Sequence, residues 1–171
     1  RIYKAQNNME LAHHEFEMAW KIKPESVDLL AELTDLEVST GKTSLTKKRL
    51  KEILSKQNDH PVAHKFLAMT YLAENNLDKA SDEFSLHLQH HPDDYSALLK
   101  LAYLNNVMGK LSISNNYYNQ ALKKYPDDID AKLGLADVYK KQKEYNKAVK
   151  LYYEIIKKQP DHLIAVNNLE I

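Results

Sequence analysis

The feature that most constrains the fold of this chain is a sequence period of 34 residues. Counting back from Pro160 in steps of 34 residues gives, in order, Pro126, Pro92, Asn58 and Pro24. A period of this length is typical of stacked helical hairpins, each of which buries its apolar face against its neighbours. Residues 127–160 show the unit most clearly, since they contain two amphipathic stretches, a short joint and a closing proline. We therefore expect an all-α protein.

The residues that recur in each period are those that a helical hairpin must bury. A large residue of the first helix is followed at once by a small one, which lets two helices approach closely. These pairs are Leu33 and Thr34, Leu67 and Ala68, Leu101 and Ala102, and Leu135 and Ala136. A tyrosine follows three residues later at Tyr71 and Tyr139, with Tyr3 in the same register. In the second helix, an alanine precedes an aromatic residue by four positions, the spacing of one helix face. These pairs are Ala12 and Phe16, Ala80 and Phe84, and Ala148 and Tyr152.

The joint between the two helices also recurs. Asn7, Gly41, Asn75 and Gly109 share one position, and glycine or asparagine there predicts a helix that ends in the left-handed conformation. Lys143 breaks the pattern, so we expect its joint to be strained or differently shaped. Five aspartates near the start of a first helix are candidate caps. They are Asp93, Asp94, Asp127, Asp128 and Asp161.

These motifs resemble the tetratricopeptide repeat (TPR) family over essentially the whole chain. The resemblance implies a right-handed superhelical solenoid of antiparallel helix-turn-helix repeats. Residues 27–58 depart most from the pattern, with Glu37 in place of the tyrosine, Thr46 in place of the alanine and Asn58 in place of the proline. We expect a partial repeat at 1–25, a degenerate repeat at 26–59, full repeats at 60–93, 94–127 and 128–161, and a first helix of a further repeat at 162–171.

Composition argues against several classes of function. The chain has 24 acidic and 24 basic residues, and its only arginines are Arg1 and Arg49, so it lacks the basic surplus that nucleic-acid binding uses. No apolar run reaches the ~18 to 20 residues of a membrane-spanning helix, so we expect no membrane insertion. The chain starts within a repeat, so a signal segment of a parent protein would lie outside it. The absence of cysteine leaves the cellular compartment open.

Neither an active site nor a metal site is expected. The three glycines stand alone, so no phosphate-binding loop or nucleophile elbow is present. Three histidine groups could share an ion, but none has a third and fourth ligand at motif spacing. They are His60 with His64, His87 with His90 and His91, and His13 with His14. We therefore expect no enzymatic activity and no cofactor.

The remaining function is recognition of another protein. The resemblance implies that the face of the first helices opposite the hairpin core lines a groove that contacts a partner. The predicted groove residues are Lys65, Met69, Leu72, Leu99, Tyr103, Asn106, Leu133, Asp137 and Lys140. For Leu99 and Leu133 the alternative is that they fill the space between adjacent first helices.

We also keep open a second function, that of a structural assembly or oligomerisation module of a larger TPR protein. Ile164, Val166 and Leu169 belong to a first helix whose partner helix is not present in the sequence. Their apolar side chains predict weak dimers formed through this end of the chain.

Overall fold

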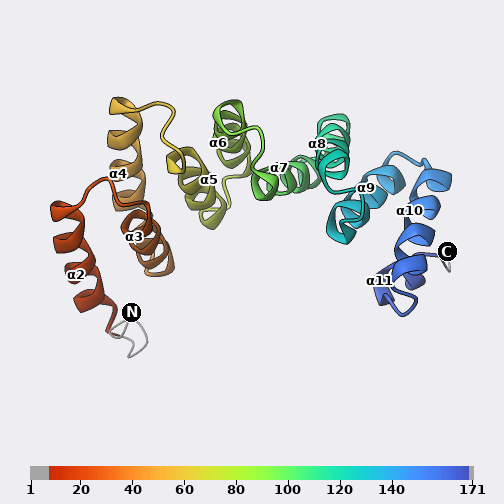
Figure 1. Ribbon diagram of the computed structural model, residues 1–171, viewed down its shortest axis with the longest axis horizontal. Coiled ribbons are helices and arrows are strands. Elements are labelled where there is room, and N and C mark those ends of the chain that lie inside the picture. Colours follow the sequence, from red (N-terminus) through yellow and green to blue (C-terminus); the bar gives the residue numbers. More distant parts are fainter. Residues whose placement is uncertain (1–7, 170–171) are drawn as a thin grey trace. The chain divides into compact units, whose positions relative to one another are not determined.

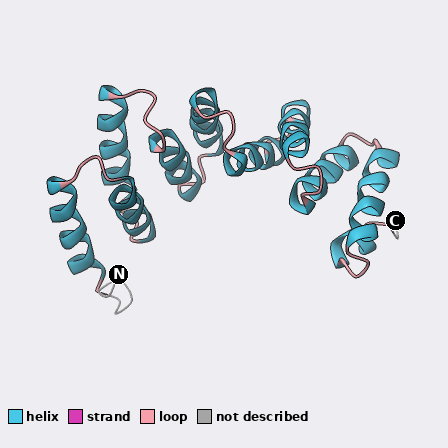
Figure 2. Cartoon of the chain, viewed as in Figure 1, coloured by secondary structure: helices cyan, strands magenta, loops and turns pink. Residues whose placement is uncertain are grey.

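The structure is a computed structural model that describes residues 8–169. These residues form ten α-helices and no strands (Figures 1 and 2). The helices are α2 (Met9–Ile22), α3 (Val27–Ser39), α4 (Thr43–Lys56), α5 (Ala63–Ala73), α6 (Leu77–His90), α7 (Tyr95–Val107), α8 (Leu111–Lys124), α9 (Ile129–Lys141), α10 (Tyr145–Lys158) and α11 (Leu163–Asn167). The predicted helix tail at residues 1–6, with Tyr3 and Asn7, lies outside the described residues. No described helix has the length and apolar character needed to cross a bilayer.

The helix bounds follow the sequence pattern closely. The second helices α2, α4, α6, α8 and α10 each have 14 residues and recur with the period of 34 residues. The first helices α3, α7 and α9 each have 13 residues and keep the same period. The exception is α5, which begins at Ala63 rather than Pro61 and has no side-chain cap, because Pro61 and Val62 belong to the preceding turn. The short α11 is capped by His162 rather than by the predicted Asp161, and the ring nitrogen Nδ1 accepts a hydrogen bond from the Ala165 N–H.

The described residues divide into two compact units, 8–92 and 93–169. In each unit the recurring large and small residues of the first helices are buried, as predicted. Those in the first unit are Leu33, Thr34, Leu67 and Ala68, and those in the second are Leu101, Ala102, Leu135 and Ala136. Ala12, Ala80 and Ala148 of the second helices are buried too, as are the aromatic rings of Phe84 and Tyr152. Each core therefore consists of apolar side chains supplied alternately by first and second helices.

All four described joints have the same backbone shape. Gly41, Asn75, Gly109 and Lys143 have φ angles of 74°, 55°, 74° and 62°. At the last joint the N–H of Lys143 donates to the carbonyl of Lys140 and that of Glu144 to the carbonyl of Tyr139. The same two bonds close the joint at Gly109 through Asn106 and Asn105. The Lys143 joint is therefore not differently shaped, and its cost is the left-handed conformation of a residue with a β-carbon.

The paired aspartates have divided roles. Asp94 and Asp128 cap α7 and α9, accepting hydrogen bonds of 3.0 and 2.7 Å from the N–H groups of Ala97 and Ala131. Their neighbours do not cap helices but form ion pairs with the second helix of the same hairpin. Asp93 receives Lys124 Nζ at 2.8 Å, and Asp127 receives Lys158 Nζ at 2.5 Å. In each Asp-Asp pair, the second aspartate therefore caps a first helix, and the first aspartate forms an ion pair at the end of the following second helix.

Candidate functional site

In the second unit, Asn106 and Asp137 lie together at the junction of α7 and α9. The Asn106 side-chain amide donates a hydrogen bond of 2.7 Å to Asp137 Oδ2. Lys141 Nζ donates to Asn106 Oδ1 at 2.9 Å and lies 3.0 Å from Asp137 Oδ2. Although partial burial opposes it, these interactions hold the pKa of Asp137 below its usual value. The three side chains form a closed polar cluster with a carboxylate that remains charged.

Lys140, another predicted groove residue on α9, does not join this cluster. Its ammonium donates to Asn168 Oδ1 at 2.5 Å, and the Asn168 amide in turn donates to the carbonyl of Ile164. Lys140 therefore links α9 to α11. Sequence reasoning chose Lys140 and omitted its neighbour Lys141, because helical phase alone does not show which of two adjacent lysines reaches a given partner.

Tyr118, from the second helix α8, reaches the same region because Gly134 has no side chain. A β-carbon on Gly134 would lie 2.2 Å from Cζ of Tyr118. Burial raises the pKa of Tyr118 to about 12, and the neighbouring Asp137 and Tyr103 contribute to the shift. Tyr118 was not predicted at this site. Its sequence signal is Gly134, a glycine in the middle of a helix where no turn requires one.

Tyr103, on the predicted groove face of α7, is a large side chain that is exposed to solvent, with 61% of its surface accessible. Val107, one turn further along α7, is also exposed and was not predicted. Leu99 and Leu133 are instead half-buried. Leu99 packs against the core around Tyr118 and Leu135, and Leu133 packs against the core around Tyr152 and Ile155. Their burial supports the space-filling interpretation for both leucines.

The first unit carries the other three predicted groove residues on α5. Met69 is 41% exposed, whereas Lys65 and Leu72 are half-buried. Met69 is thus the apolar side chain of this set that is most open to a partner. A methionine suits such a position because its flexible thioether adapts to differently shaped ligands.

Two of the three predicted histidine groups, those around His64 and His87, do not form three-ligand clusters among the described residues. Both ring nitrogens of His64 are engaged, Nδ1 with Glu83 Oε2 at 2.7 Å and Nε2 with the Asn58 carbonyl at 3.1 Å. His87 is buried, and its ring centre lies 4.9 Å from that of His91. Burial lowers the pKa of His60. Within residues 8–169, the set of three potential metal ligands is His13, Glu17 and Glu37, which includes one histidine of the predicted pair His13 and His14.

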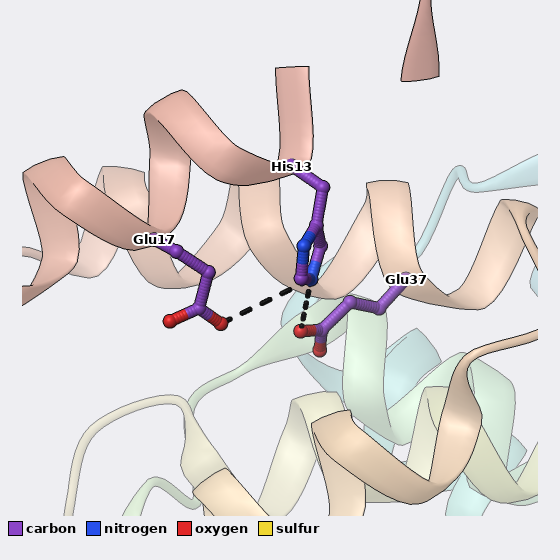
Figure 3. Close-up of side chains that lie close together, drawn as sticks. All are labelled: His13, Glu17 and Glu37. Atoms are coloured by element: carbon purple, nitrogen blue, oxygen red, sulfur yellow. Dashed lines mark hydrogen bonds and ion pairs between the residues drawn. The ribbon is translucent and has the colours of Figure 1, made fainter. Parts of the chain in front are cut away.

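Glu37 is the centre of a polar network between α2, α3 and α4, and none of its side-chain surface is exposed. Thr46 Oγ1 donates to Glu37 Oε2 at 2.6 Å, and Arg49 Nη2 donates to Oε1 at 2.6 Å. His13 Nε2 lies 3.0 Å from the same Oε1 (Figure 3). Arg49 also contacts Glu17. Burial opposes the charge of Arg49, but its bonds to Glu17 and Glu37 raise the pKa of the guanidinium. The buried carboxylate is thereby fully satisfied.

The two departures from the repeat pattern in residues 27–58 are therefore one structural feature, since Glu37 and Thr46 bond to each other. The next but one hairpin has a related substitution, with buried Asn105 and Ser114 at the corresponding positions. There each side chain bonds a backbone carbonyl. Asn105 donates to the Leu101 carbonyl and Ser114 to the Ala102 carbonyl, at 2.8 and 2.7 Å. Polar residues replace the tyrosine and alanine together in both hairpins.

Consecutive antiparallel hairpins with a shared core pattern define a helical repeat solenoid. A tetratricopeptide repeat sequence model matches residues 38–102 and 114–170, and a second model of the same repeat matches residues 96–128. The chain belongs to the tetratricopeptide repeat family. Proteins of this family generally bind protein or peptide partners, and they are typically scaffolds rather than catalysts. No curated protein sequence matches the chain.

Solved structures with the same fold share little sequence with the chain. A tetratricopeptide repeat protein from Parabacteroides merdae ATCC 43184 has a TM-score of 0.79 at 17% identity; the match covers 97% of this chain and 66% of that protein. MamA has a TM-score of 0.77 at 17% identity, with 92% of each chain covered. YrrB, described as a TPR protein with an unusual peptide-binding site, has a TM-score of 0.76 at 15% identity, with 99% and 88% covered. At these identities the likeness concerns the fold.

Proposed function

We propose that the chain is a non-enzymatic scaffold that binds a segment of a partner protein along the groove face of its first helices. The observation that carries the proposal is the contrast between the exposed ring of Tyr103 and the hydrogen-bonded polar side chains close to it. Its ring is 61% exposed, while the polar groups near it, Asn106, Asp137 and Lys141, are held by mutual bonds. An exposed aromatic ring on a fixed polar frame is typical of an interface anchor, because little side-chain freedom is lost on binding.

Each unit, taken by itself, offers an exposed apolar contact on a first helix for a peptide with an apolar centre. Met69 offers an exposed apolar contact on α5, and Val107 extends the apolar surface beside Tyr103 on α7. Methionine and tyrosine are both enriched in protein interfaces. YrrB is described as having an unusual peptide-binding site, and we extend peptide binding to this chain as part of the proposal.

The test is selection of peptides from a random display library on the whole chain, followed by hydrogen exchange with the tightest peptide. We expect slowed amide exchange in α7 and α9, whose groove faces carry Tyr103 and Asp137. Protection confined to the second helices α8 and α10 would contradict groove binding. The same exchange experiment without peptide gives the control rates.

The second candidate function, an assembly module, rests on α11. Leu163 and Ile164 are exposed there, whereas Leu169 is half-buried against the core around Tyr152. The surface available for the predicted end-mediated dimer is therefore smaller than the sequence indicates. Light scattering over a range of concentrations distinguishes the two functions, because an assembly module gains mass with concentration and loses this gain when residues 162–171 are deleted.

A further inference from the structure

The geometry points to a zinc-class metal site at His13, Glu17 and Glu37, in which Arg49 takes the place of the cation when no metal is bound. This inference is independent of the proposed groove. Figure 3 shows the three side chains meeting, with His13 and Glu17 supplied by α2 and Glu37 by α3. An imidazole nitrogen with two carboxylate oxygens suits Zn²⁺ better than Ca²⁺ or Mg²⁺, which prefer oxygen ligands alone.

The distances already approach those of a metal site. His13 Nε2 lies 3.0 Å from Glu37 Oε1 and 3.9 Å from Glu17 Oε1. Ligands bound tetrahedrally to Zn²⁺ are roughly 3.4 Å apart, given metal-ligand bonds of about 2.1 Å. The three ligand atoms all lie within 4.8 Å of one another, so shifts of less than about 1 Å at each atom would bring them to this spacing. Glu37 Oε2 is held by Thr46, so the carboxylate is oriented with Oε1 toward the other two ligands.

Arg49 marks the position of a cation in this cluster. Its Nη2 contacts both Glu37 Oε1 and Glu17 Oε1, the two oxygens that a metal ion would bridge. One guanidinium charge faces two carboxylates, so the cluster has an excess negative charge when His13 is neutral. A divalent ion at the same place compensates both carboxylates. Metal binding requires the lone pair of His13 Nε2, so the ring proton of the neutral imidazole would lie on Nδ1.

A hollow beside Arg49 can receive its side chain when a metal ion displaces it. It lines a hollow of about 520 Å³ between α2 and α4, and the same hollow is lined by Glu25 and Glu52. The guanidinium already lies 5.9 Å from the centre of the Trp20 ring, which also lines the hollow. Two carboxylates and an aromatic face can receive the displaced charge. We therefore expect metal binding and movement of Arg49 to be coupled.

The test is calorimetric titration of Zn²⁺ into the metal-free chain and its variants. His13→Gln and Glu17→Gln should each weaken Zn²⁺ binding at least tenfold, since each removes a ligand. His14→Gln is the matched control, because His14 is adjacent, exposed and outside the cluster, and it should leave this binding unchanged. Arg49→Met should tighten binding, because the competing cation is gone. The melting temperature of Arg49→Met should fall without metal and recover with Zn²⁺.

Co²⁺ provides a second readout. Its ligand-field absorption should show a tetrahedral site in the parent chain and in His14→Gln, and this signal should be lost in His13→Gln. Three outcomes would overturn the assignment. They are equal loss of binding in His14→Gln, Zn²⁺ binding that persists in the double variant His13→Gln and Glu17→Gln, and an Arg49→Met variant whose stability does not respond to Zn²⁺.

Discussion

The hydroxyl of Thr46 donates a hydrogen bond of 2.6 Å to the buried carboxylate of Glu37, and both residues stand where the repeat has other side chains. A buried carboxylate is destabilising unless it is paired and hydrogen-bonded. Thr46, Arg49 and His13 together meet that requirement for Glu37. Residues 27–58 therefore retain the helical hairpin with a polar centre in place of an aromatic one.

This relationship predicts strong coupling between Thr46 and Glu37. Thr46→Val keeps the shape of the side chain but leaves the carboxylate one donor short, so we expect a loss of about 1.5 to 3 kcal/mol in the free energy of unfolding. In a Glu37→Leu background the same change should cost much less, since no acceptor remains. Urea denaturation of the four chains of this double-mutant cycle measures the coupling, and additive effects would contradict the direct bond.

The contact between Tyr118 and Gly134 gives a prediction for the second unit. Gly134→Ala would place a β-carbon 2.2 Å from Cζ of Tyr118, which forces the ring to move. We expect a destabilisation of about 1 to 3 kcal/mol, as for other overpacked cores. The shorter side chain in Tyr118→Leu should make Gly134→Ala tolerable. If Gly134→Ala is harmless in the parent chain, the ring does not occupy this space.

Lys143 should be a site where glycine stabilises the chain. Its φ of 62° is left-handed, a conformation that costs a residue with a β-carbon about 1 to 2 kcal/mol. Lys143→Gly removes this cost but adds freedom to the unfolded chain, so we expect a net gain of about 0.5 to 1 kcal/mol. Gly109→Ala, at the matching joint, should have the opposite sign. Thermal denaturation of both variants tests the pair.

A core substitution tests the register of the repeats. Leu101 has no exposed surface, so Leu101→Ala should lower the free energy of unfolding by about 2 to 5 kcal/mol. Leu163→Ala is the control in the same unit, because Leu163 is 75% exposed and its loss should matter by only a few tenths of a kcal/mol. Similar losses for the two variants would show that the register is wrong.

The sequence predicts the helices and the core well because both depend on local chemistry. The second helices recur with the period of 34 residues, and the leucine-alanine pairs of the first helices are buried as expected. The caps were less predictable. Asp93 and Asp94 have the same chemistry, and only the backbone direction decides that Asp94 caps α7 while Asp93 pairs with Lys124.

The site was harder to predict because it depends on contacts between residues distant in sequence. A search for metal ligands at motif spacing does not reach Glu37, which lies 24 residues from His13. Tyr118 reaches the region of Asp137 from a second helix, whereas the repeat pattern assigns the groove to first helices alone. Two sequence signals pointed to these features without defining them. They are the joint departure of Glu37 and Thr46 from the repeat and the lone Gly134 within a helix.

The most direct test of groove binding compares two tyrosines in the same unit. Tyr103 on α7 and Tyr153 on α10 are each 61% exposed, so removing either ring should affect folding little. With a peptide selected on the parent chain, calorimetric titration should show that Tyr103→Ala weakens binding by about 2 kcal/mol or more, as for an interface anchor. Tyr153→Ala should leave the affinity unchanged. Unchanged affinity in Tyr103→Ala, or an equal loss in Tyr153→Ala, would contradict recognition through the groove.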